Sequence, residues 1–184
     1  MATITKYILY HGTPKRFVKS ILRDGFKIQT SDTHWMGKGV YFYDSVDKSR
    51  KFVSKTRSGE TPAVIKADIE TNDENLLDLV NNKTHRDNFA KFIKSQEPEY
   101  SNSIRLKRLD MSKEKERNES IFLLKCALFD YYCLLNDIEL VICEHNTHPG
   151  SYTQMLLKSL SIDENVEVQY CAKTLDIIKN IICV

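Results

Sequence analysis

An apolar strand that turns directly into a short capped helix opens this chain, and no other feature constrains the fold as strongly. Residues 5–10, TKYILY, have the β-branched and aromatic content of a strand, and residues 14–24 predict a helix. Thr13 suits the N-cap, Pro14 the first helical position and Gly25 a left-handed stop. The residues predicted to share one helix face are Phe17, Val18, Ile21 and Leu22. The helix does not explain His11 and Gly12, which stand at the strand end, where folds commonly open to a ligand.

A second unit of the same kind follows at residues 37–54. Residues 40–43, VYFY, predict a strand, and the glycines at 37 and 39 allow close approach of the backbone to a ligand. Asp44 or Ser45 can cap a second helix that runs to about residue 54. The segment AVIKADIE then predicts a strand at residues 63–70, with the odd-numbered apolar residues Ile65, Ala67 and Ile69 on one face.

The rest of the chain predicts a helical middle followed by a second β-rich end. Residues 72–80 indicate a capped turn or short helix, residues 84–95 a helix, and residues 112–135 a long helix whose second half, apolar from Ile121, is buried. Strands are predicted at 138–143 and 166–172, a helix at 151–160, and a final helix or edge element at 174–182. The expected fold is therefore α+β, a single domain over residues 1–184 with a helical insert at about 73–135.

Composition limits the function classes. Hydrophobic residues make up 41% and charged residues 28% of 184, which is ordinary globular usage, and no apolar run has the length of a membrane span. A net charge of +2 does not indicate a nucleic-acid partner by itself, and acids interrupt the basic run 104–117, which predicts a solvated face. Five cysteines in apolar stretches, without a CxxC pair, predict reduced core thiols and a cytoplasmic protein. His145 and His148 lie in HNTH before Pro-Gly, which is typical of a turn, so no metal site is expected.

Three short segments carry a resemblance to a known family. They are YHGT at residues 10–13, GKGVYFYDSVDKSRKF at 37–52, and the weaker VEVQYC at 166–171. Together they resemble the ADP-ribosyltransferase fold of the poly(ADP-ribose) polymerase and diphtheria-toxin type, over about 50 contiguous residues. The resemblance implies split β-sheets around a cleft for NAD, which serves as co-substrate.

The resemblance also implies roles for individual residues. His11 would hydrogen-bond a ribose hydroxyl of NAD, the backbone of Gly12 would hold the nicotinamide carboxamide, and Tyr41 would stack on the nicotinamide ring. Ser49 matches a serine that fixes the carboxamide, and Phe52 stands where the family has a second stacking tyrosine, whose π-face it retains. Thr13 completes the predicted cofactor-binding set. Each of these residues also has a structural reading, as a strand-end histidine or as core aromatics, and His34 and Trp35 could line the pocket or stiffen a loop.

The catalytic acid is the point at which the sequence departs from the family. Loss of nicotinamide leaves an oxocarbenium-like sugar that needs negative charge nearby, which active relatives supply with a glutamate. Here Gln169 takes that position, and Glu167, two residues earlier on the same strand face, is expected to enter the cleft with it. Glu144, at the end of the preceding strand, is the alternative acid.

The resemblance implies an NAD-dependent mono-ADP-ribosyltransferase that releases nicotinamide and modifies a protein or nucleic acid, in the manner of a small toxin or effector. A neutralising antitoxin would then cover the cleft or the helical insert. The alternatives are an NAD glycohydrolase, a catalytically silent NAD or ADP-ribose binding module, and an RNA 2′-phosphotransferase, whose related fold also carries an HGT segment.

Overall fold

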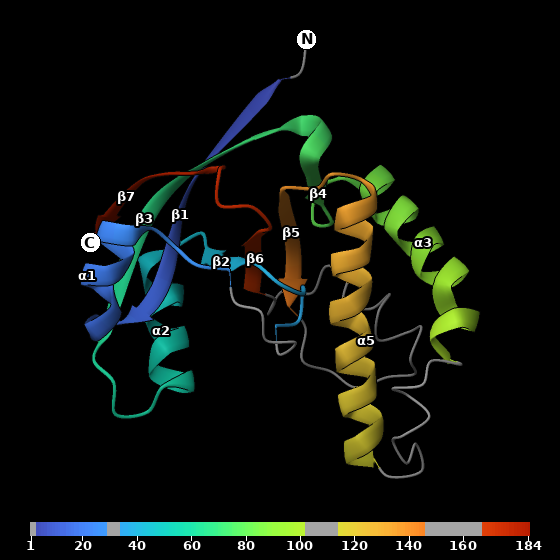
Figure 1. Cartoon of the computed structure of the whole chain (residues 1–184), viewed down its shortest axis with the longest axis horizontal. Helices are drawn as coiled ribbons and strands as arrows, with labels where there is room; N and C mark the ends of the chain where they lie inside the picture. Colours follow the sequence, from blue (N-terminus) through green and yellow to red (C-terminus); the bar gives the residue numbers. More distant parts are fainter. Residues whose placement is uncertain (1–2, 29–33, 102–113, 146–166) are drawn as a thin grey trace.

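The structure is a computed structural model in which residues 3–28, 34–101, 114–145 and 167–184 are described (Figure 1). The strands are β1 (Ile4–Pro14), β2 (Val40–Tyr43), β3 (Pro62–Asn72), β4 (Leu76–Asp78), β5 (Leu140–His145), β6 (Glu167–Ala172) and β7 (Ile178–Cys183). The helices are α1 (Lys15–Asp24), α2 (Val46–Thr56), the short 3₁₀ helix η1 (Asp73–Asn75), α3 (Lys83–Ser101) and α5 (Glu114–Leu135). This mixed composition confirms the predicted α+β class.

The strands form one sheet in the order β4-β5-β6-β2-β1-β3-β7. Its two halves, β4-β5-β6-β2 and β1-β3-β7, meet where β1 pairs with β2 through the single register pair Tyr10 and Tyr43. β1 and β3, by contrast, pair along their whole lengths, from Ile4 opposite Asn72 to Pro14 opposite Pro62. The structure therefore joins the two predicted sheets into one seven-stranded sheet, whose narrowest junction lies between β1 and β2.

Two apolar cores lie on opposite faces of this sheet. Strand side chains alternate, so Val40 and Phe42 of β2 join the core under α1, whereas Tyr41 packs toward the core under α3 and α5. We call these the α1 face and the α5 face. Helix α2 also packs on the α5 face. A β-carbon at Gly12 would point at α2, whereas Leu9 of the same strand and Ile65 of β3 point into the core under α1, on the opposite face. The α5 face thus carries α2 over one half of the sheet and α5 over the other (Figure 1).

Several elements follow the local sequence closely. Ser45 caps α2 by accepting the Lys48 amide hydrogen on its hydroxyl, as predicted. Ile65, Ala67 and Ile69 are fully buried on one face of β3. The middle of α5 is buried through Leu124, Leu128 and Phe129, but its end is not, since Leu134 and Leu135 are 76% and 56% exposed. Within the described part of the chain, no helix combines the length and apolar composition that a bilayer span needs.

Other local predictions are wrong. β1 continues through Thr13 to Pro14, which precedes α1, because pairing with β3 holds these residues extended, so Thr13 is not the helix cap. α1 rests on the sheet only through Val18 and Ile21, whereas Phe17 and Leu22 are exposed. The predicted helical insert contributes a strand as well, because β4 pairs in parallel with β5.

Near the C-terminus the ambiguous last element is resolved as β7, an edge strand on β3, which leaves Cys183 exposed while the other four cysteines are buried. The predicted helix 151–160 and most of the basic run 104–117 lie outside the described residues.

Candidate active site

A close contact between β1 and α2 forms one wall of the site. A β-carbon at position 12 would lie 2.8 Å from the carbonyl carbon of Ser49 and 2.9 Å from a Val53 methyl, and closer still to the Ser49 carbonyl oxygen. Only glycine permits this approach. The Ser49 hydroxyl lies 2.9 Å from the carbonyl oxygens of both Tyr10 and Ser45, and Ser49 is fully buried. Ser49 therefore ties α2 to β1, and this tie holds the backbone at Gly12 in place.

His11 lies at the junction of the two half-sheets. Its Nδ1 is 2.8 Å from the carbonyl oxygen of Tyr41. Because a carbonyl oxygen only accepts hydrogen bonds, Nδ1 carries the proton, and Nε2 of the neutral ring remains an acceptor. The imidazole packs edge-on against Phe26 and Phe42, with ring centroids 5.0 and 5.8 Å away. Burial lowers the pKa of His11 below its ordinary value of 6.5, which favours the neutral form.

The phenol of Tyr41 points to the other face of β2 from the imidazole of His11. The Tyr41 hydroxyl accepts the Met36 amide hydrogen at 2.9 Å and donates to the Gly37 carbonyl at 2.8 Å. Gly37 has a φ of 78°, which favours glycine and lets the chain turn back over the ring. Burial raises the pKa of Tyr41, so it remains a neutral phenol. The structure therefore joins His11 to Tyr41 through the backbone and does not bring the two rings face to face.

A chain of buried polar groups lies beside Tyr41 on the α5 face. The indole of Trp35 donates to Oε1 of Gln169 at 2.6 Å, and Nε2 of Gln169 donates to the hydroxyl of Tyr43 at 2.9 Å. Gln169 is 7% exposed and Tyr43 is 3% exposed. Both ends of the Gln169 amide are therefore satisfied within the protein, which fixes its orientation.

Phe52 and Glu167 border this chain of polar groups. The Phe52 ring is tilted at 45° to the Tyr43 ring with centroids 5.9 Å apart, and Phe52 remains 42% exposed. Burial raises the pKa of Tyr43, and the negative charge of Glu167 adds to the rise. Phe52 offers an accessible π-face, and Glu167 lies two residues before Gln169 on the same strand face of β6.

The other candidate acid lies elsewhere. Cys143 pairs with Gln169 across β5 and β6, so its neighbour Glu144, opposite Val168, is directed to the α1 face. Burial raises the pKa of Glu144, and the positive charge of Arg86 partly offsets this rise. The Glu167 and Gln169 pair is therefore the one that shares a sheet face with Tyr41 and Tyr43.

Lys125 in α5, which the sequence did not indicate as functional, lies beside Trp35. The ammonium of Lys125 in α5 lies 4.4 Å from the ring centroid of Trp35, a cation–π arrangement. Burial lowers the pKa of Lys125. The apolar run that contains Lys125 gave no reason to treat it as functional. The sequence likewise predicts Tyr43 only as part of a strand, because its partner Gln169 lies 126 residues away.

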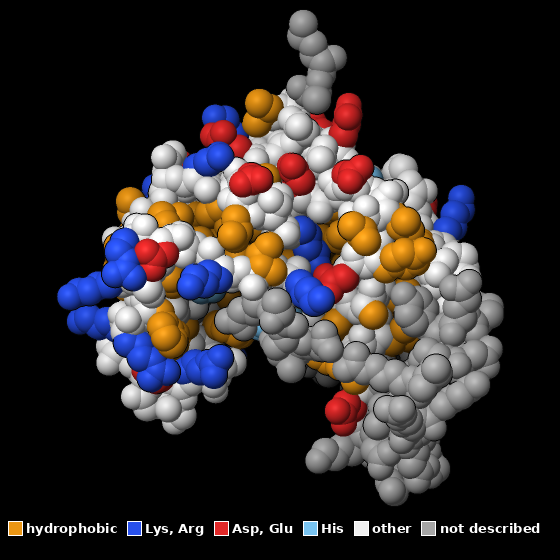
Figure 2. All heavy atoms as spheres, viewed as in Figure 1, with side chains coloured by type: hydrophobic (Ala, Val, Ile, Leu, Met, Phe, Trp, Pro, Cys, Tyr) orange, Lys and Arg blue, Asp and Glu red, His pale blue; other side chains and the backbone are white. Residues whose placement is uncertain are grey.

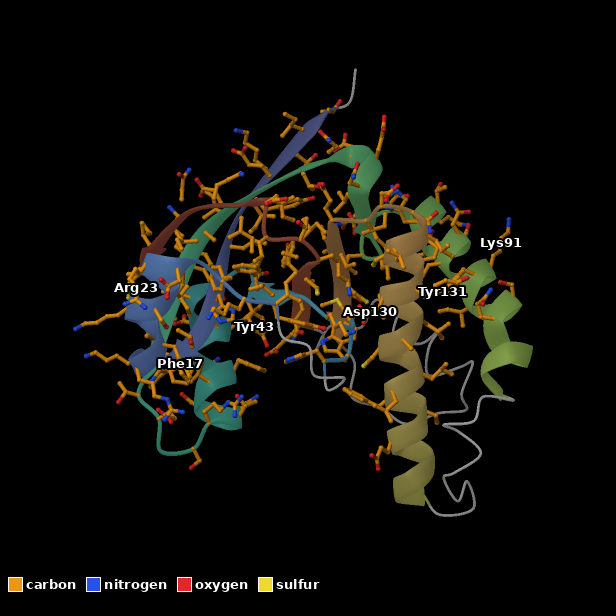
Figure 3. All side chains as sticks on the ribbon, in the orientation of Figure 1. Phe17, Arg23, Tyr43, Lys91, Asp130 and Tyr131 are labelled. Carbon is orange, nitrogen blue, oxygen red and sulfur yellow. The ribbon has the colours of Figure 1, made fainter. Side chains whose placement is uncertain are left out.

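The surface is hollowed between the part of the molecule that carries α1 and α2 and the part that carries α5 (Figure 2). Tyr43 and Asp130 lie on either side of this region in the stick view (Figure 3). Among the described residues no three His, Cys, Asp or Glu side chains come together as a metal site would require. The residue types at the site suit NAD: they comprise the backbone at Gly12, the exposed ring of Phe52, the amide of Gln169 and the carboxylate of Glu167. The remaining predicted residue, Thr13, is buried within β1 opposite Ala63.

A split α+β sheet with this histidine, glycine, tyrosine and serine at its junction defines an ADP-ribosyltransferase-like domain. The family model of the poly(ADP-ribose) polymerase catalytic domain matches residues 2–155, most of the chain. The chain belongs to this family, and the matched segment contains His11, Tyr41 and Ser49 but ends before β6.

A protein of Methanocaldococcus jannaschii described as uncharacterized is 27% identical over 85 residues, which cover 43% of this chain and 40% of that protein. The match thus spans about two fifths of that relative's length, and no solved structure matches significantly.

Proposed function

We propose that this protein is an NAD-dependent mono-ADP-ribosyltransferase that releases nicotinamide and transfers ADP-ribose to a macromolecule. The observation that carries the proposal is the contact of Gly12 with Ser49, which lies within the segment matched by the family model. In that family NAD is the substrate, and a backbone wall held by a buried serine is suited to a flat carboxamide.

The remaining groups supply the other needs of the reaction. The exposed face of Phe52 can stack on the departing ring, and the amide of Gln169, held by Trp35 and Tyr43, can orient a sugar hydroxyl. The carboxylate of Glu167 would stabilise the positive charge that develops on the sugar as the glycosidic bond breaks. Nε2 of the neutral His11 ring keeps an acceptor lone pair, but the ring lies on the α1 face, so its predicted contact with a ribose hydroxyl is not part of the group formed by Phe52, Gln169 and Glu167.

Transfer of a single ADP-ribose is favoured over polymer growth because Gln169 brings no charge to the position where polymerising relatives carry glutamate. The acceptor is a protein or a nucleic acid, and a toxin-like or effector-like role is part of the proposal, with an antitoxin as the partner that would cover the site. The free thiols of the five cysteines are consistent with a cytoplasmic location.

The test is incubation with NAD labelled in both the nicotinamide and the adenine parts, with candidate protein and nucleic-acid acceptors. We expect free nicotinamide and a labelled macromolecule, with Glu167→Gln reducing nicotinamide release by at least about tenfold, the rate equivalent of 1.4 kcal/mol. Glu74→Gln, an exposed acid in η1, serves as the matched control and should leave the rate unchanged. Equal rates for the wild type and Glu167→Gln would refute the assignment of the acid.

A catalytically silent binding module is the second candidate, and two observations favour it. Both ends of the Gln169 amide are already engaged, and the His11 ring is directed to the opposite face from the Tyr41 phenol. NAD binding by calorimetry without nicotinamide release would establish this function instead. Nicotinamide release that is independent of any acceptor would establish the glycohydrolase.

A further inference from the structure

Positive charge is concentrated on α1, α2 and the residues next to them. Residues 15–27 and 44–60 contain ten Lys and Arg but only four Asp and Glu, although the whole chain has a net charge of +2. This excess of six positive charges means that the rest of the chain is net negative. In the space-filling view the basic side chains gather over α1 and α2 (Figure 2).

Most of these basic side chains are exposed and lack an acidic partner. Ion pairs join Arg16 to Glu60, Arg23 to Asp24 and Lys48 to Asp44. Among the described residues no ion pair involves the other seven, all of which are exposed: Lys15, Lys19, Lys27, Arg50, Lys51, Lys55 and Arg57. Because unpaired charges on one surface add their fields, this region attracts anions.

The two helices pack on opposite faces of the sheet, and their basic residues form one continuous surface, which we call the basic face, around the end of β1 and β3 where Pro14 pairs with Pro62. The backbone amide of Lys15 donates to the carbonyl of Thr61 at 2.8 Å, so the start of α1 lies beside the segment that leaves α2. The Arg16 and Glu60 pair links the same two segments. On the outer side of α2, a shallow open depression of about 330 Å³ is lined by residues of this helix alone: Asp47, Arg50, Lys51, Ser54 and Lys55. The basic face therefore runs from α1 along α2.

Two aromatic side chains are exposed within this face. Phe17 of α1 is 45% exposed, and Phe52 of α2 is 42% exposed. The guanidinium of Arg16 lies 4.8 Å from the centroid of the Phe17 ring, which leaves the ring beside a cation at the surface. Phe17 and Arg23 mark this edge of the molecule in Figure 3. Exposed rings among unpaired cations are the combination by which proteins bind single-stranded nucleic acids, since bases stack and phosphates pair.

The basic face also leads to the candidate site. Phe52 lies on the same helix as Ser49 and contacts the ring of Tyr43, whose hydroxyl bonds Gln169. A strand held along the outer side of α2 would therefore reach the site at Phe52. An acidic protein could use the charges alone, but it would not require the exposed ring of Phe17.

We propose that the face formed by α1 and α2 binds single-stranded nucleic acid and that the acceptor of this protein is a nucleic acid. The binding part stands by itself, whereas the acceptor part rests on the proposed transferase function. The phosphates would pair with Arg50, Lys51, Lys55 and Lys19, and a base would stack on Phe17.

The binding test uses fluorescently labelled oligo-dT and oligo-U without NAD, over a series of salt concentrations. Each phosphate contact contributes about 0.7 to the magnitude of the slope of the logarithm of the binding constant against the logarithm of the salt concentration. Loss of one contact therefore weakens binding by about fivefold at ~0.1 M salt. Lys51→Gln combined with Lys55→Gln should lower the slope by about 1.4 and weaken binding by up to about 25-fold. Phe17→Ala should weaken binding by about fivefold or more at every salt concentration.

The matched control is Lys91→Gln combined with Lys94→Gln, which removes the same charge from exposed positions of α3 on the far side of the molecule (Figure 3). The control should bind as the wild type does. An equal loss of affinity in both double variants, no effect of Phe17→Ala, or equal affinity for duplex and single strands would overturn the proposal. Thermal melts of all variants exclude unfolding as the cause of a loss.

The acceptor part is tested by transfer of label from NAD to the same oligonucleotides. Nicotinamide release with label only on proteins would overturn the acceptor assignment while leaving the transferase function intact. Oligonucleotide binding without nicotinamide release would overturn the transferase function and support only the binding face.

Discussion

Replacing Gly12 by alanine tests the contact that forms one wall of the site. The new β-carbon would lie 2.8 Å from the Ser49 carbonyl carbon and 2.9 Å from a Val53 methyl, whereas carbon atoms pack best at about 3.5 to 4.0 Å. Closing that deficit of about 0.7 Å requires α2 to move away from β1. Overpacking of this kind costs about 1–3 kcal/mol, and we expect the upper end because a helix backbone must shift.

The assay combines thermal unfolding with nicotinamide release. A loss of about 3 kcal/mol corresponds to a fall in the melting temperature of roughly 6–12 °C for a chain of this size. Gly59→Ala is the control, since open space surrounds position 59 and only its φ of 86° strains an alanine, at about 1 kcal/mol. Nicotinamide release should fall in Gly12→Ala and persist in Gly59→Ala. A melting temperature for Gly12→Ala equal to that of Gly59→Ala would refute the reasoning.

Tyr43→Phe should lower the free energy of unfolding, measured by urea titration, by about 1–3 kcal/mol, because the Gln169 amide group loses the hydroxyl that accepts its hydrogen bond. If the effects of Tyr43→Phe and Gln169→Leu on the free energy of unfolding were strictly additive in the double variant, this explanation would be contradicted. Burial lowers the pKa of His11 in the folded state below 6.5, the ordinary value expected in the unfolded state. As the pH falls through 6.5, His11 is therefore protonated in the unfolded state before it is in the folded state. The stability that the neutral ring provides is present above pH 6.5 and is lost as the pH falls. Urea midpoints measured at decreasing pH should decline less in His11→Gln, and parallel curves would contradict this. In native protein, a thiol reagent should label only Cys183 quickly, since burial raises the pKa of each of the other four to about 11 or 12; rapid labelling of a second thiol would contradict this.

Local patterns in the sequence were sufficient for much of the fold. The alternation of Ile65, Ala67 and Ile69 predicted a strand with one buried face, and the Ser45 cap predicted the start of α2, because both features depend on neighbours within a few residues. The glycine and tyrosine of the two N-terminal segments were enough to indicate the family.

Contacts between distant segments could not be predicted in this way. Thr13 has the chemistry of a helix cap, but pairing with β3 keeps it in a strand, and β4 joins the sheet only because β5 lies beside it. The basic charges of α1 and α2 look dispersed along the chain, and they form one face because the start of α1 lies against Thr61.

By itself the sequence determined the class of the fold, the order of most elements and the residue types at the junction, since these follow from periodicity and short motifs. The tertiary structure decided which side chains meet. It directed His11 and the phenol of Tyr41 to opposite faces, and it joined Trp35, Gln169 and Tyr43 across 134 and 126 residues. Strand order and register set these relations, and they are fixed only when the two faces of the sheet bury their cores together.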